Sequence, residues 1–97
     1  MHWTHNPQEQ EGTYLFSGTF YVTDLVSSQL TPVEISAIYL CMQVFVREND
    51  GADYLQVFEN EKGAKLFFID QLSREMIQSG DYEPEHNHCT LLFSSEY

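Results

Sequence analysis

One segment, residues 31–47, constrains the fold more than any other part of the chain. It opens with Thr-Pro-Val-Glu at residues 31–34, in which the Thr hydroxyl and the Glu carboxylate can each accept a hydrogen bond from a backbone N–H of the first helical turn. No charged residue occurs in residues 35–46. A helix this apolar must be covered on much of its circumference, so we expect a sheet on one face and a partner or a second subunit on the remainder.

Apolar side chains recur along this helix at helical spacing. The residues predicted to face the sheet are Ile35, Ile38, Met42 and Phe45. Leu40, Cys41 and Val44 are expected to widen the same stripe. If the helix instead joins two copies of the chain, the residues at the centre of that contact would be Tyr39, Val46 and their neighbours.

Segments rich in aromatic and β-branched residues lie on both sides of this helix. Residues 13–23 predict a strand interrupted by a bulge at Gly18, or a tight hairpin, with Leu15, Phe20 and Val22 on the core face. A strand of this kind needs partners, which the second half of the chain supplies.

Residues 53–60 and 65–70 flank a short turn that contains glycine and predict a β-hairpin. Residues 71–79 predict a short helix that ends at Gly80, and residues 89–94 predict a closing strand. The order of elements indicates an α+β fold: a small antiparallel sheet of four to five strands, with one long helix on one face and a short second helix.

The length of 97 residues allows one domain. Residues 1–12 are polar and predict a flexible or loosely docked arm. Trp3 is expected to pack on the single domain of residues 13–97, or, if it is exposed, to anchor a partner. No apolar run is long enough for a membrane span, and the first residues do not have the pattern of a secretory signal. We therefore expect a cytoplasmic protein in which Cys41 and Cys89 are reduced.

Acidic residues outnumber basic ones by fifteen to four, which gives a formal net charge of −11. Such a surface repels nucleic acid and anionic membrane and attracts basic protein surfaces. The charge also exceeds the magnitude of about 2–8 that suits a small domain for solubility alone. The composition therefore favours a protein that binds a cationic partner or imitates a polyanion.

Two groups of acidic residues are the predicted partner-binding site. Asp81, Glu83 and Glu85 alternate, so in an extended segment they would project from one side, with Tyr82 as an aromatic contact. The second group follows the long helix and consists of Glu48, Asp50 and Asp53.

Three blocks resemble a family of small uncharacterised proteins of low-GC Gram-positive bacteria and their phages. The blocks are Tyr-Val-Thr at residues 21–23, Asp-Tyr-Leu-Gln-Val-Phe-Glu at 53–59, and His-Cys-Thr-Leu-Leu-Phe at 88–93 with the Glu-Tyr ending. Residues 80–85 depart from the acidic turn that the family carries there. The resemblance implies a single α+β domain in a phage or mobile element, and no activity.

An enzyme is the less favoured class. His86, His88 and Cys89 are possible zinc ligands, with His2 and His5 as remote candidates, but His88 and Cys89 are adjacent and would point to opposite sides of a strand. We therefore assign no metal, cofactor or catalytic residue. A small metal-dependent enzyme that uses His86 and His88 stays as an alternative.

The leading hypothesis is a non-enzymatic DNA mimic that inhibits a basic, nucleic-acid-binding host defence protein. An anti-CRISPR protein that inhibits a Cas9-type effector, or an anti-restriction protein, would fit, because a Cas9-type effector reads DNA with arginines and holds the heteroduplex in a positively charged channel. The alternative from another class is a structural or regulatory module that forms a homodimer through helix 32–47.

Overall fold

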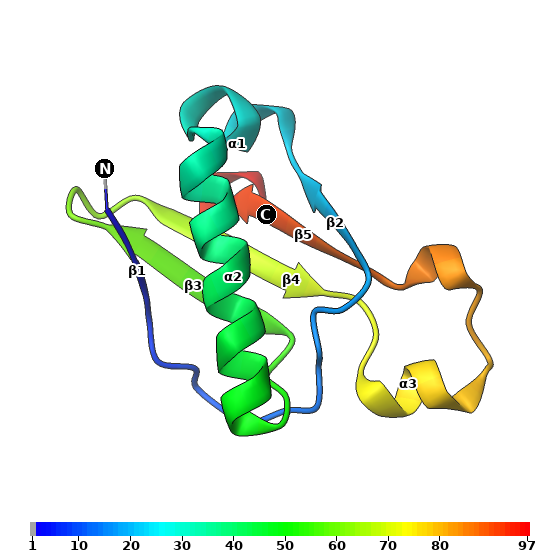
Figure 1. The fold of residues 1–97 in the computed structure, drawn as a ribbon. Helices are drawn as coiled ribbons and strands as arrows, with labels where there is room; N and C mark the ends of the chain where they lie inside the picture. The colour runs from blue at the N-terminus through cyan, green and yellow to red at the C-terminus, as the bar shows by residue number, and fades with distance from the viewer. Residues whose placement is uncertain (1) are drawn as a thin grey trace.

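Five strands form one mixed sheet in the order β1-β3-β4-β5-β2, with a long helix across one face (Figure 1). The computed structural model describes residues 2–97. The elements are β1 (Trp3–His5), β2 (Thr19–Val22), α1 (Asp24–Gln29), α2 (Pro32–Asn49), β3 (Leu55–Asn60), β4 (Lys65–Asp70), α3 (Arg74–Ser79), the short 3-10 helix η1 (Pro84–His86), β5 (His88–Phe93) and the 3-10 turn η2 (Ser94–Glu96). This arrangement is the predicted α+β fold.

The start of α2 is the predicted capping box. The Thr31 hydroxyl accepts a hydrogen bond from the Glu34 N–H at 3.1 Å, and the Glu34 carboxylate accepts one from the Thr31 N–H at 2.8 Å. The helix ends at Asp50, which has a left-handed backbone with φ of 53°. Both ends are therefore set by local hydrogen bonds and backbone geometry.

The inward face of α2 packs on the sheet as expected. Ile38 and Met42 are buried, and Ile35 and Phe45 pack against the same core. The prediction that Leu40, Cys41 and Val44 widen this stripe is wrong: Leu40 is 61% exposed, Val44 is 40% exposed and Cys41 is exposed. The reason is geometric, since Leu40 lies about 200° around the helix from Ile38 and the sheet covers one side only.

The segment of residues 13–23 forms a shorter strand than predicted. Only β2 is a strand, while Phe16 rather than Leu15 is fully buried and has a positive φ of 51°. β2 lies at the sheet edge parallel to β5, so the sheet is not antiparallel throughout. The connection between these two strands runs through most of the chain, so no hairpin fixes their relative direction.

The N-terminal segment is held on the sheet rather than being loosely docked. β1 pairs antiparallel with β3, with Trp3 opposite Asn60, and the Trp3 side chain packs against the core as expected. Further on, the Gln8 side-chain oxygen accepts hydrogen bonds from the Asp53 N–H and from the Gln56 side chain, both at 3.0 Å. Neither contact has a local signature, because each joins residues more than forty positions apart.

The two faces of the sheet differ. The face toward α2 carries the buried side chains of β3, β4 and β5, including Phe58, Phe68 and Leu91. Among residues 2–97, no helix lies across the opposite face, and α3 sits beyond the end of β4 (Figure 1). Within the same residues, no helix has both the length and the apolar character needed to cross a bilayer.

Candidate functional site

Residues 75–86 form an accessible acidic lobe. It comprises α3 after its first residue, the following loop and η1, and it projects away from the sheet and α2 (Figure 1). We call it the acidic lobe. Every residue from Ile77 to His86 is exposed, and α3 has no buried residue.

The lysine, arginine and carboxylate content of the acidic lobe is of one sign. It carries four carboxylates and neither lysine nor arginine; the carboxylates belong to Glu75, Asp81, Glu83 and Glu85. Within the described part of the chain, Asp81, Glu83 and Glu85 make no ion pair and no side-chain hydrogen bond, whereas Glu75 accepts a hydrogen bond from the Thr13 hydroxyl. Three full negative charges therefore face solvent close together in sequence.

The base of the acidic lobe is anchored to the sheet. The Asn87 carbonyl accepts a hydrogen bond from the Thr19 N–H at 3.1 Å, and the His88 carbonyl accepts one from the Gln71 N–H at 3.1 Å. Gly18 permits this close approach, because a Cβ there would lie 2.1 Å from the Asn87 carbonyl oxygen. These contacts fix the place where the lobe leaves the sheet.

The local shape of the lobe differs from the extended segment that the alternation predicts. The Pro84–His86 segment is a 3-10 helix in which the His86 N–H donates to the Glu83 carbonyl at 2.9 Å. The physical reason is Pro84, whose fixed φ suits the first position of a helical turn. Glu85 therefore does not continue a straight row from Asp81 and Glu83, although all three are exposed. Tyr82 stands between them with 46% of its surface exposed.

The second predicted group does not assemble as an accessible cluster. Glu48 is exposed on the last turn of α2. Asp50 is exposed but pairs with Arg74, whose Nη2 lies 3.0 Å from the Asp50 carboxylate. Asp53 is only 8% exposed, and its carboxylate accepts hydrogen bonds from the Tyr54 N–H and the Gln10 side chain. The structure thus assigns Asp53 a role in holding the N-terminal segment.

The possible zinc ligands do not converge. His88 and Cys89 point to opposite faces of β5, as predicted: Cys89 is buried, and the His88 ring meets Tyr21 edge-on at 5.5 Å on the outer face. His86 is exposed on η1. In the part of the chain that the structure describes, no three His, Cys, Asp or Glu side chains gather in a way that could hold a metal ion.

Two features were missed by sequence reasoning. Glu75 joins the acidic lobe because α3 turns away from the sheet, a direction that local sequence does not encode. The open sheet face carries Leu55, Val57 and Phe67; alternation along residues 53–60 places the first two on one face, but it does not tell which face the helix leaves open.

Comparisons with protein-family models, with curated proteins and with solved structures find no match to this chain.

Proposed function

We propose that this protein is a non-catalytic inhibitor that binds a basic, nucleic-acid-binding protein through its acidic lobe. The observation that carries the proposal is the exposure of Asp81, Glu83 and Glu85 on a projecting element that contains neither lysine nor arginine. Carboxylates placed this way can occupy sites that otherwise bind backbone phosphates.

Tyr82 adds an anchor of a second kind. Its half-exposed ring belongs to the same exposed segment as the three carboxylates, and tyrosine is one of the residue types that contribute most to protein–protein binding energy. An aromatic ring among acids can also stack on arginine, the residue that reads phosphates and bases in nucleic-acid sites. The proposed partner surface is therefore rich in arginine.

A host defence protein is the partner class to test first. The proposal of a phage or mobile-element setting follows from the resemblance of the three sequence blocks, and it places the protein in the host cytoplasm. Cas9-type effectors come first, because they hold nucleic acid in a positively charged channel and read a short motif with arginines. The protein would then be an anti-CRISPR protein, or an anti-restriction protein if a restriction enzyme is the target.

The test compares the protein with a variant in which Asp81, Glu83 and Glu85 are all changed to Lys. Nuclease and DNA-binding activities of Cas9-type and restriction enzymes are measured with each. We expect inhibition by the natural chain and none by the variant. A matched control changes three other exposed acids to Lys, Glu11, Asp24 and Glu61, and shifts the net charge by the same amount. Equal inhibition by the natural chain and the lobe variant would contradict the proposed site.

Self-association through α2 is a second candidate, favoured by a specific observation. The outward face of α2 exposes Val33 by 78%, Leu40 by 61% and Val44 by 40%. Tyr39 and Val46, which a contact between copies was expected to cover, pack against the core instead. Light scattering after size-exclusion chromatography tests this candidate, and Leu40→Lys should abolish any dimer that forms through this face.

A further inference from the structure

The open face of the sheet carries a continuous apolar surface. Strand pairing places alternate side chains of β3, β4 and β5 on the side away from α2. The apolar residues of this set are Leu55, Val57, Phe67, Ile69 and Leu92, all half-buried. In the described chain no helix covers them, and the Tyr97 ring lies edge-on to Phe67 at 5.5 Å. Part of this apolar surface therefore stays in contact with water.

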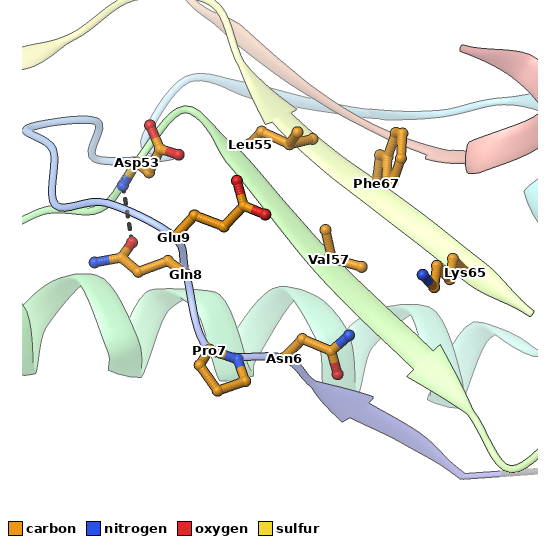
Figure 2. A pocket seen from close by; sticks show the side chains of 9 residues that line it. All are labelled: Asn6, Pro7, Gln8, Glu9, Asp53, Leu55, Val57, Lys65 and Phe67. Atoms are coloured by element: carbon orange, nitrogen blue, oxygen red, sulfur yellow. Dashed lines mark hydrogen bonds between the residues drawn. The ribbon is translucent and has the colours of Figure 1, made fainter. Parts of the chain in front are cut away.

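Part of this face is hollowed into a groove. Leu55, Val57 and Phe67 form its apolar floor, and the N-terminal segment 6–9 forms one wall (Figure 2). The cavity has a volume of about 350 Å³, which suits one or two side chains. The wall is fixed in place because Gln8 accepts the hydrogen bond from the Asp53 N–H that Figure 2 shows.

Glu9 supplies the exposed carboxylate of this groove. Its side chain extends from the wall toward the strand that carries Leu55 and Val57 (Figure 2). Glu9 is exposed, and among residues 2–97 it makes neither an ion pair nor a hydrogen bond. Lys65 is the basic residue of the lining and lies opposite Glu59 in the strand register, while Asp53 adds a second carboxylate, so two acids of the lining face one lysine. The groove therefore combines an apolar floor with one unpaired carboxylate.

This combination matches the chemistry of a long basic side chain. Arginine and lysine lay their methylene stems along apolar surface while the charged end stays at the rim. A stem on Val57 and Phe67 would bring the cation beside Glu9. A second copy of this chain fits less well, because it would bring another acidic surface with a net charge of −11.

We propose that this groove binds an amphipathic basic segment of the partner protein, with an arginine or lysine seated against Leu55, Val57 and Phe67 and paired with Glu9. The inference rests on the proposed function, since the partner is the same basic protein. It adds a second contact, separate from the acidic lobe, that recognises apolar and cationic groups together.

The experiment uses the full chain labelled with ¹⁵N and a short helical peptide of leucine and arginine as the probe. Two control peptides replace arginine by glutamate or leucine by serine. We expect the first peptide to change the amide signals of Leu55, Val57 and Phe67 in a saturable way. Both controls should change these signals weakly, because each has lost one of the two properties that the groove recognises.

Two matched variants test the carboxylate. Glu9→Gln should raise the Kd of the leucine–arginine peptide about three- to fivefold, as expected for an exposed ion pair. Glu11→Gln removes the same charge from the same segment outside the groove lining and should leave the Kd unchanged. Val57→Thr keeps the β-branched shape and should weaken binding by removing apolar floor.

Several results would overturn the inference. Signal changes confined to residues 75–86 would show that the peptide binds the acidic lobe and does not bind the groove. Equal binding of the glutamate peptide would show that the groove recognises apolar groups only. Signal changes that depend on protein concentration in the absence of peptide would show that the surface joins two copies of the chain. Equal effects of Glu9→Gln and Glu11→Gln would exclude the ion pair. Absence of any change with the peptide would also reject the groove, while the nuclease assay decides the lobe independently.

Discussion

The buried carboxylate of Asp70 accepts a hydrogen bond of 2.8 Å from the backbone N–H of Phe16, fifty-four residues earlier in the chain. Asp70 is 2% exposed, and its other oxygen accepts from the Gln71 N–H at 3.0 Å. The Phe16 carbonyl in turn accepts from the Gln43 side chain at 2.8 Å. Side chains from β4 and α2 thus hold both backbone groups of a residue with a positive φ.

The free energy of unfolding should depend on pH in part through the ionisation of Asp70. Burial raises the pKa of its carboxyl, although the hydrogen bonds from Phe16 and Gln71 oppose that shift. Because the pKa of Asp70 is higher in the folded state, its stabilising contribution to the free energy of unfolding is fully present below the pKa of the unfolded chain. That contribution is lost as the pH rises through the pKa of the folded state. The stability advantage of the natural chain over Asp70→Asn should therefore be largest in acid and shrink toward neutral pH.

Urea denaturation of both proteins across acidic and neutral pH measures this difference. The comparison cancels the repulsion among the other carboxylates, which both chains share. An advantage that grows with pH would mean that the hydrogen bonds outweigh burial and that the pKa of Asp70 is lowered instead.

The two thiols should differ in reactivity. Cys89 is buried opposite Asp70, and burial with that nearby carboxylate raises its pKa to about 12, so it should resist alkylation in the native state. Cys41 is exposed on α2 and should react, although partial desolvation raises its pKa and slows the reaction. Intact mass after native iodoacetamide treatment should show one label, and peptide mapping should locate it at Cys41. A label on Cys89 first would contradict this packing.

The parts of the fold that follow from local signals could be predicted from the sequence. The capping box of α2 and the hairpin of β3 and β4 depend on residues that are close in the chain. The helix α1 was missed although a signal was present, since the Thr23 hydroxyl accepts from the Val26 N–H at 3.2 Å in the manner of an N-cap.

The remainder depends on distant contacts. The pairing of β1 with β3, the position of Phe16 and the burial of Asp53 all depend on contacts between residues more than forty positions apart. In the candidate site, the sequence was enough to predict that Asp81 and Glu83 are exposed. The groove beside Glu9 was not, because its wall exists only once the N-terminal segment docks on the sheet.

Thr31→Ala should destabilise the protein by about 1 kcal/mol, since it removes the side-chain acceptor for the Glu34 N–H at the start of α2. Ser36→Ala is the matched control, an exposed hydroxyl inside the same helix, and should leave the free energy of unfolding nearly unchanged. Chemical denaturation gives both values. A Thr31→Ala protein as stable as the Ser36→Ala protein would show that the capping box contributes little.

Gly18→Ala should weaken the junction between β2 and the acidic lobe. The added Cβ would lie 2.1 Å from the Asn87 carbonyl oxygen, so one of the two segments must move. We expect a loss of about 1–3 kcal/mol, as for other overpacked sites. Ser17→Ala is the control at the exposed neighbour. Loss of hydrogen-exchange protection at the Thr19 amide would locate the damage, whereas unchanged protection would contradict the close approach.

The final prediction concerns salt. If the acidic lobe binds a basic nucleic-acid site, affinity for the inhibited nuclease should fall as ionic strength rises, because exposed charge pairs are screened over about 10 Å at 0.1 M salt. Changing Asp81, Glu83 and Glu85 to Asn, Gln and Gln removes three charges without reversing them and should flatten that dependence. The matched control changes Glu11, Asp24 and Glu61 to Gln, Asn and Gln and should keep the steep slope. Surface plasmon resonance in a salt series measures both, with the association rate as the readout most sensitive to charge. Equal slopes for the two variants would show that the whole acidic surface, and not the lobe, attracts the partner.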